Sequence, residues 1–372
     1  MADRGHYNAV RERNFVIARE PLATAQVRHV VSLLVVFPAI MKSLITTGDG
    51  SAKLVEVADP VAGPGELLVA PISAGICGTD LEIISGDGDP AFVKYPASLG
   101  HEWAGKVIGH GPGVTSPAIG SRIVVTGIIP CQECFECKNG DTNRCLIYDE
   151  IGFTRPGAAA DLITVPAWLA HVVGDNVSDE SAVLAEPTAV VTQAFMKANP
   201  KQGSKILIIG DGTIALIAAT MAKTYKPELI HMLGLKDGQN EIAKVAGADE
   251  FLTQPTDDKY DLIIEAAGAP TRISAAVGQL VRGGTLLLLG YPGHQRTAAI
   301  VVDDVINGDL NIIGSFGSSL AAWSKTVEMF NTGKLDLGYL VTHKFKLSEF
   351  SAAIEALKSA PAPRGKIALI IN

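Results

Sequence analysis

The stretch Lys205-Ile-Leu-Ile-Ile-Gly-Asp-Gly-Thr-Ile-Ala215 decides the fold of this chain. The apolar run Ile206–Ile209 is typical of a short buried strand. Gly210 and Gly212 then indicate a tight turn, and the alanine-rich segment from Thr213 to Lys223 predicts a helix. A buried strand that passes through a glycine turn directly into a helix predicts a βαβ unit and hence a parallel sheet.

The same alternation of strand and helix continues along the chain. Four apolar runs are expected to be buried strands of one sheet: residues 205–209, 229–233, 261–265 and 285–289. A helix is expected over residues 323–331, and the apolar tail 366–371 is expected to return as a strand. We therefore predict an α/β fold with a doubly wound parallel sheet over residues 189–328.

The preceding part of the chain has a different texture. Short apolar runs broken by glycine and proline begin at Met41 and continue to residue 165. Strands and turns at this density predict a β-rich, barrel-like domain over residues 41–188. Because Met41 opens a natural first strand, residues 1–40 are expected to lie outside the fold, as a leader or an over-extended start.

The size and composition of the chain exclude several classes of protein. A chain of 372 residues can form two domains, and 47% hydrophobic residues are enough for full cores. The net charge of -8 provides no electrostatic footprint for nucleic acid. The apolar run 30–40 is too short to span a bilayer, so no membrane partner is expected.

Four of the five cysteines fall in one short segment with the spacing C-x2-C-x2-C-x7-C: Cys131, Cys134, Cys137 and Cys145. Four thiolates on such a polar loop can surround one zinc ion in a structural site. Paired disulfides would leave one thiol over, and cysteines this close are poorly placed to bridge each other. We predict zinc, which also implies a reducing, cytoplasmic compartment.

The glycine turn after the first strand of the parallel sheet indicates a cofactor site. Gly210 and Gly212 would allow a pyrophosphate to approach the backbone at the start of the helix, beside Thr213 and Ile214. Ala215 is the third small residue that a dinucleotide fingerprint allows. A plain tight turn is the alternative. We expect the protein to bind NADP or NAD. Further contacts with the dinucleotide are expected from two positions near the ends of later strands, Gly268 and Leu289.

The choice between NAD and NADP depends on the end of the second strand. An acidic residue there usually binds the ribose hydroxyls of NAD. The strand ends at Gly234, which would leave room for a 2′-phosphate, and Lys236 could neutralise that phosphate. The sequence therefore favours NADP, unless Asp237 reaches back to the ribose.

Three further residues have the chemistry of a catalytic zinc site. Cys77 lies in Gly75-Ile-Cys-Gly-Thr-Asp80, His101 follows Gly100, and Glu186 precedes a proline. A thiolate, an imidazole and a carboxylate would leave an open position on zinc. Taken singly, each also fits a structural role, as a buried thiol, a core histidine and a helix-terminal acid.

These motifs together resemble the zinc-containing medium-chain dehydrogenase/reductase family, from Met41 to Asn372. The resemblance rests on Cys-Gly-Thr-Asp at Cys77–Asp80, Gly-His-Glu at Gly100–Glu102, the four-cysteine segment and Gly210-x-Gly212, which follow the family's order. It implies a GroES-like catalytic domain, completed by residues 329–372, and a Rossmann domain. Glu186-Pro187 is similar to the sorbitol, threonine and glucose dehydrogenase branch.

The resemblance also implies roles. Cys77 and His101 would hold the catalytic zinc, with Glu102 as a ligand or directly behind the ligands, and Glu186 as a ligand directly or through water. Thr79 would take the proton of a substrate alcohol. The family implies two zinc ions per chain, a secondary alcohol, polyol or sugar as substrate, hydride transfer to NAD(P), and a homodimer or homotetramer.

One departure from the family bears on the substrate. Many polyol dehydrogenases have a histidine where this chain has Glu82. The motif is similar to archaeal glucose dehydrogenases, which makes an aldose or polyol the first expectation and an L-threonine 3-dehydrogenase-type activity the alternative. A zinc-free reductase should lack the cysteine segment, and a non-catalytic dinucleotide-binding regulator should have lost a ligand or Thr79.

Overall fold

The computed structural model describes residues 39–88, 91–235, 237–293 and 296–372. The first strand, β1 (Ile40–Thr46), begins one residue before Met41 and pairs antiparallel with β2 (Ala52–Ala58). The expected extension 1–40 therefore lies, apart from its last two residues, outside the described residues. Within those residues, no helix is long and apolar enough to cross a membrane.

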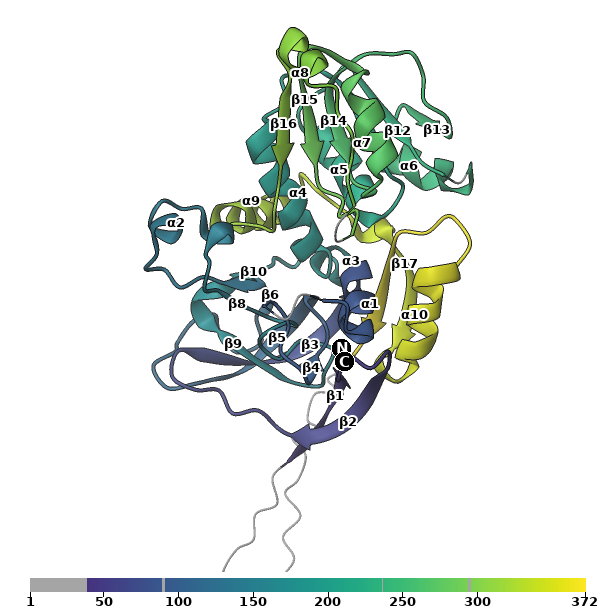
Figure 1. The fold of residues 1–372 in the computed structure, drawn as a ribbon. Coiled ribbons are helices and arrows are strands. Elements are labelled where there is room, and N and C mark those ends of the chain that lie inside the picture. Colours follow the sequence, from purple (N-terminus) through teal and green to yellow (C-terminus); the bar gives the residue numbers. More distant parts are fainter. Residues whose placement is uncertain (1–38, 89–90, 236, 294–295) are drawn as a thin grey trace, which may run out of the picture. The chain divides into compact units, whose positions relative to one another are not determined.

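The apolar run 205–209 lies at the centre of a six-stranded parallel sheet (Figure 1). Its strand order is β13-β12-β11-β14-β15-β16, so the chain runs outward in one direction from β11 and then outward in the other. The strands are β11 (Lys205–Ile209), β12 (Leu229–Leu233), β13 (Glu250–Leu252), β14 (Tyr260–Glu265), β15 (Leu280–Leu288) and β16 (Asn311–Gly314). This order confirms the predicted doubly wound α/β fold.

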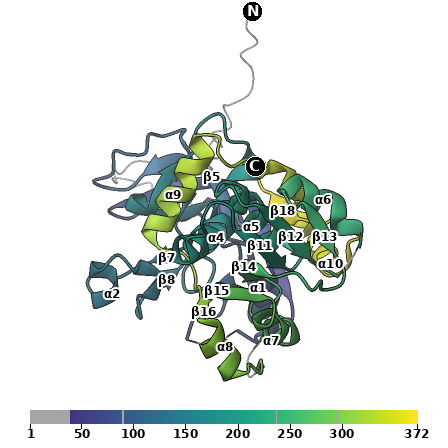
Figure 2. The same cartoon turned by 90° about the horizontal axis from the view of Figure 1, so that it is seen from above.

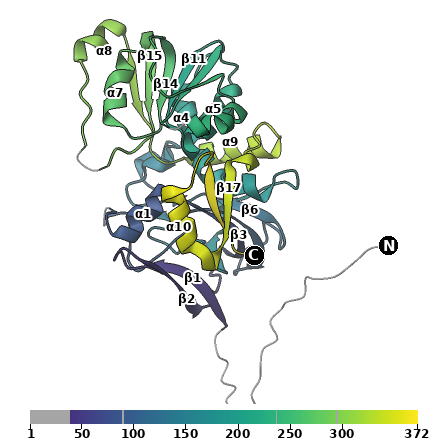
Figure 3. The same cartoon turned by 90° about the vertical axis from the view of Figure 1, so that its right-hand side faces the viewer.

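Helices cover both faces of this sheet because its central strands are apolar on both sides. Ile206 and Ile208 of β11 belong to one buried cluster, and Leu207 and Ile209 belong to another. Figure 3 shows α7 and α8 on one side of the sheet and α4 and α5 on the other. The helices around the sheet are α4 (Ala185–Ala198), α5 (Thr213–Lys223), α6 (Asn240–Ala246), α7 (Pro270–Val277), α8 (Val302–Gly308) and α9 (Leu320–Asn331).

The second large sheet is mainly antiparallel and contains both early and late parts of the chain. Its order is β10-β6-β5-β3-β18-β17, with β9 paired to β3. The strands are β3 (Glu66–Ile76), β5 (Glu102–His110), β6 (Arg122–Val125), β9 (Ile163–Pro166), β10 (Ala170–Val172), β17 (Val341–Lys346) and β18 (Lys366–Ile370). The C-terminal tail is a strand, as predicted, and β18 lies antiparallel to β3, where Ala368 faces Gly75.

Smaller elements surround this sheet. The segment that contains α2 projects from the β-rich part in Figures 1 and 2. These elements are β4 (Ala97–Ser98), β7 (Ile128–Ile129), β8 (Asp149–Glu150), α1 (Gly78–Ser85), α2 (Phe135–Lys138), α3 (Asp179–Ala182) and α10 (Phe350–Ser359). The β-rich texture predicted for this part of the chain is therefore present.

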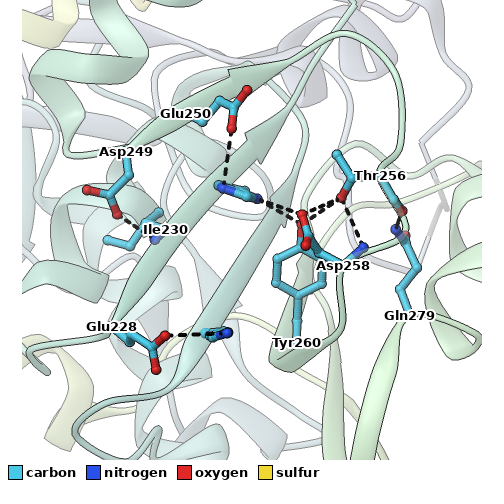
Figure 4. Close-up of polar contacts among 10 residues, drawn as sticks. Glu228, Ile230, Asp249, Glu250, Thr256, Asp258, Tyr260 and Gln279 are labelled. Carbon is cyan, nitrogen blue, oxygen red and sulfur yellow. Dashed lines mark hydrogen bonds and ion pairs between the residues drawn. The ribbon is translucent and has the colours of Figure 1, made fainter.

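A buried polar cluster fastens β12 to β14 across the central strand (Figure 4). His231, which is 6% exposed, has its Nδ1 atom 2.9 Å from the hydroxyl of Tyr260. Its Nε2 atom lies 3.6 Å from the carboxylate of Glu250 on β13. Thr256 lies 3.3 Å from the same tyrosine hydroxyl. The tyrosine hydroxyl therefore gives the buried imidazole a hydrogen-bond partner at Nδ1.

Candidate functional site

Cys77 lies at the junction between β3 and α1, where it caps the start of the helix. Its backbone N–H donates to Oδ2 of Asp80 at 2.8 Å, which fixes the turn. Thr79 stands in the first turn of α1, with its Oγ1 atom 3.7 Å from Sγ of Cys77. The strand-to-helix turn thus places a thiol and a hydroxyl side by side.

His101 and Glu102 reach the same place from the next strand. In the antiparallel pair of β3 and β5, Gly75 faces Glu102, so the end of β3 lies beside the start of β5. Ligand atoms of Cys77, His101 and Glu102 all lie within 4.8 Å of one another. A Cβ atom on Gly75 would be 2.3 Å from the Glu102 carboxylate, so only glycine fits there. These three predicted residues are therefore brought together.

Asp80 orients the imidazole of His101. The two buried side chains face each other, with Nδ1 of His101 3.4 Å from Oδ1 of Asp80. Burial lowers the pKa of His101, but the Asp80 carboxylate opposes this and holds that pKa well above its usual value. The ring of Phe153 lies 5.1 Å away, centroid to centroid. A carboxylate behind one ring nitrogen leaves the other nitrogen for a metal, which is the usual arrangement of a histidine ligand.

Glu102 has a buried cationic partner that the sequence analysis missed. The Nζ atom of Lys366 on β18 donates to Oε1 of Glu102 at 2.8 Å and to the carbonyl of Ile76 at 3.3 Å. The two side chains are 4% and 2% exposed. Burial lowers the pKa of Lys366, but Glu102 and Cys77 together raise it above its ordinary value. The sequence signal for this partner is a lysine at the first position of an otherwise apolar strand.

Two further carboxylates, those of Glu186 and Glu150, interact electrostatically with this cluster. Burial, and then the charge of Glu102, raise the pKa of Glu186 to about 8, while His101 opposes that rise. Glu186, in the first turn of α4, is therefore electrostatically coupled to the cluster, although it lies outside the set of atoms within 4.8 Å. Glu150 on β8 was not predicted. Burial raises its pKa to about 7, against the influence of His101.

The four-cysteine segment folds into a second compact cluster. All five cysteines of the chain are free thiols, and the sulfur atoms of the four in this segment lie within 4.8 Å of one another. Backbone N–H groups of Cys131 and Cys134 donate to the Sγ atoms of Cys145 and Cys131, each at 3.4 Å. Backbone hydrogen bonds of this kind lower the pKa of Cys131 to about 6. Four converging sulfurs on polar loops fit a tetrahedral zinc site.

The glycine turn after β11 has the backbone that a dinucleotide requires. Gly210 has a φ of +126°, and a Cβ atom there would be 3.3 Å from the backbone of Ala266. Gly212 is the N-cap of α5, and within the described residues no side chain caps this helix. The N–H groups of the first turn, which include Thr213 and Ile214, therefore remain available for a phosphate.

Loops after β14 and β15 meet beside this turn. Glu265 accepts hydrogen bonds from the N–H groups of Ala267, Gly268 and Ala269, each at 3.1 Å. The N–H of Leu289 donates to the Glu265 carbonyl at 2.8 Å. The expected cofactor positions Gly268 and Leu289 are thus both bonded to Glu265, Gly268 to its carboxylate and Leu289 to its backbone carbonyl, and sequence reasoning missed this residue. Lys236, the expected phosphate partner, lies outside the described residues.

The two metal-type clusters and the glycine turn define a class: a two-domain oxidoreductase that combines zinc with a nicotinamide dinucleotide. Residues 63–175 match the alcohol dehydrogenase GroES-like domain, and residues 179–360 match the glucose dehydrogenase C-terminus. The chain belongs to the zinc-containing medium-chain dehydrogenase/reductase family, and it is an NAD(P)-dependent oxidoreductase of the alcohol and polyol dehydrogenase type. The expected GroES-like and Rossmann architecture is confirmed.

Relatives of known activity agree with this family. L-threonine 3-dehydrogenase from Salmonella paratyphi B is 29% identical over 85% of this chain and 95% of its own length. Galactitol-1-phosphate dehydrogenase from Escherichia coli is 27% identical, with a TM-score of 0.80 over 88% of this chain and 99% of that one. A cobalt- and zinc-bound thermostable alcohol dehydrogenase from Pyrobaculum aerophilum is 25% identical, with a TM-score of 0.81 over 89% and 100% of the two chains.

Proposed function

We propose that Cys77, His101 and Glu102 form the core of a catalytic zinc site and that Glu186 completes it, directly or through water. The observation that carries the proposal is the convergence of the first three side chains within 4.8 Å. The thiol of Cys77, the imidazole of His101 and the carboxylate of Glu186 would supply three zinc ligands of the usual types. The ion pair with Lys366 favours a position for Glu102 behind the other ligands, where it balances the charge of the site.

A zinc ion at this place would act as a Lewis acid on the hydroxyl group of a bound alcohol. The Thr79 hydroxyl, beside Cys77, would accept the proton of that alcohol and pass it outward. The Asp80 carboxylate, 3.4 Å from Nδ1 of His101, would hold that ring in one orientation. The loops fixed by Glu265 would place the nicotinamide ring for hydride transfer, since they carry Gly268 and Leu289.

We propose that the four-cysteine segment holds a second, structural zinc, so that the chain binds about two zinc ions. A site closed by four thiolates has no open position for a substrate, so it would contribute stability and not chemistry. The C-terminal part of this segment is anchored at the start of α9: Asn143 donates to the carbonyl of Phe316 at 2.7 Å, and the N–H of Leu320 donates to Thr142 at 3.0 Å.

We propose that the chain forms two domains with the limits that the sequence predicts. Residues 41–188 with 329–372 would form the catalytic domain, in keeping with the pairing of β18 with β3. Residues 189–328, which contain all six strands of the parallel sheet, would bind the dinucleotide. Free thiols favour a cytoplasmic location. The edge strand β16 favours a homodimer or homotetramer built on that sheet.

The substrate that the site favours is a secondary alcohol of the polyol or sugar type. Galactitol-1-phosphate dehydrogenase supports that class, whereas the threonine dehydrogenases keep an amino alcohol as the second candidate. Loops at residues 87–95, of which residues 89–90 lie outside the described part of the chain, and 149–159 are expected to shape the substrate pocket. Within the second of these, the Phe153 ring lies 5.1 Å from the His101 ring, centroid to centroid, and Glu150 interacts electrostatically with His101.

The experiment that tests this function is a screen of sugars, polyols and amino alcohols with NAD and with NADP. We expect reduction of the nicotinamide by at least one secondary alcohol of the polyol or sugar group. A clear preference for L-threonine would replace the substrate class while keeping the reaction. Binding of dinucleotide without turnover of any alcohol would contradict the proposed function and favour a regulator on the same scaffold.

A further inference from the structure

We propose that Asp211 supplies the carboxylate that binds the adenosine ribose of the cofactor and that it makes the site select NAD over NADP. The inference rests on the proposed dinucleotide site at Gly210 and Gly212. Asp211 lies between these two glycines, in the turn from β11 to α5. Acidic residues that recognise this ribose usually come from the end of the next strand, where this chain has Gly234.

The Asp211 side chain occupies the space that a side chain at position 234 would fill. A Cβ atom built on Gly234 would be 2.7 Å from Oδ2 of Asp211 and 2.8 Å from its Cβ atom. The same Cβ atom would be 2.5 Å from Cζ of Phe251. Gly234 therefore does not leave a vacant hole for a phosphate. It is glycine because Asp211 and Phe251 already meet there.

Hydrogen bonds hold Asp211 in this position. Its Oδ2 atom accepts a bond from the N–H of Leu235 at 2.9 Å. Its backbone carbonyl accepts a bond from Nε2 of Gln239 at 2.7 Å, and Gln239, which is 4% exposed, is bonded in turn to the backbone of Arg364. Within the described residues, Oδ1 of Asp211 has no hydrogen-bond donor, so it can accept from a ribose hydroxyl.

Charge then decides between the two cofactors. The ribose of NAD offers hydroxyl donors, which suit a carboxylate acceptor. The 2′-phosphate of NADP is itself negative, and bringing it against Asp211 would place like charges side by side at a cost in affinity. The expected preference for NAD is the opposite of the preference for NADP that Gly234 and Lys236 indicated. The reason is that the structure places a carboxylate where the sequence indicated free space.

The test compares dissociation constants for NAD and NADP, measured by calorimetry on the zinc-loaded chain without substrate. Wild-type protein should bind NAD at least about tenfold more tightly than NADP. Asp211→Asn keeps an acceptor for the Leu235 N–H, so it should fold normally. It should shift the ratio of the two constants toward NADP by about tenfold or more, because it removes the repelling charge.

Asp237→Asn is the matched control, since this nearby acid is the other candidate for the ribose, and it should leave both constants unchanged. A wild-type preference for NADP, or an Asp211→Asn ratio equal to that of wild type, would overturn the inference while leaving the proposed function intact. Wild-type protein that binds neither dinucleotide would overturn both. A shift caused by Asp237→Asn alone would assign the ribose to that residue.

Discussion

Cys77→Ser should reduce the turnover of any alcohol substrate by about a thousandfold or more while dinucleotide affinity stays unchanged. Among the described residues, Cys77 is the one thiol of the catalytic cluster, because the other four cysteines gather in the separate segment. A hydroxyl is a much weaker zinc ligand than a thiolate, and loss of Lewis-acid assistance removes several kcal/mol of transition-state stabilisation. Steady-state rates, with dinucleotide binding measured in parallel, check the result.

The fold should survive this substitution, since the backbone N–H of residue 77 still donates to Asp80. Ser85→Ala, at the exposed far end of the same helix, is the control and should keep normal turnover, because it loses only surface hydrogen bonds to Glu82 and Asp87. If Cys77→Ser kept half of the wild-type rate, zinc held by Cys77 would have no part in the reaction.

Cys134→Ser should remove the second zinc and lower the thermal midpoint by roughly 5–10 °C. The segment 131–145 contains only short helical elements, and the sulfur atoms of its four cysteines lie within 4.8 Å of one another. A zinc ion held by these sulfurs would therefore stabilise the segment. The binding free energy of a structural zinc is folding free energy, so losing one ligand destabilises the folded chain by several kcal/mol. Metal analysis and calorimetric melting check the two parts of this prediction.

The comparison with Cys77→Ser separates the two sites. Both variants should bind about one zinc fewer than wild type, but only Cys134→Ser should melt much earlier, because α1 and β3 are fixed by other bonds. Glu133→Gln, beside the ligand in the same segment, should leave zinc content and melting unchanged. A Cys134→Ser variant with unaltered zinc content would show that these four thiols hold no metal.

The sequence determined the fold so well because strand, turn and helix signals agree with one another around Gly210. The apolar run before it is typical of a buried strand, and the paired glycines favour a tight turn into the helix that follows. The four-cysteine cluster was also visible in the sequence, since four thiols at this spacing have few other uses, whereas Cys77 and His101 each also fit a structural role. The convergence of Cys77, His101 and Glu102 depends on the pairing of β3 with β5. The spacing of these residues in the sequence could not predict that pairing.

Residues that act through long-range packing escaped prediction. Lys366 stands 264 positions from Glu102 in the sequence, and only the pairing of β18 with β3 makes them partners. Glu150 lies in a two-residue strand without a motif. Asp211 was visible in the glycine turn, but its meaning depends on how closely that turn approaches Gly234. The lack of an acidic residue at position 234 therefore did not predict the cofactor preference, because the carboxylate of Asp211 lies in the same space.

Zinc held by the cluster of Cys77, His101 and Glu102 should be required for hydride transfer from an alcohol to the nicotinamide. The most direct test removes zinc with a chelator, returns it stepwise, and follows reduction of the nicotinamide by the best alcohol from the screen. We predict that turnover disappears with the metal and returns as zinc binds, up to about two ions per chain. Full turnover by the metal-free chain would contradict the claim.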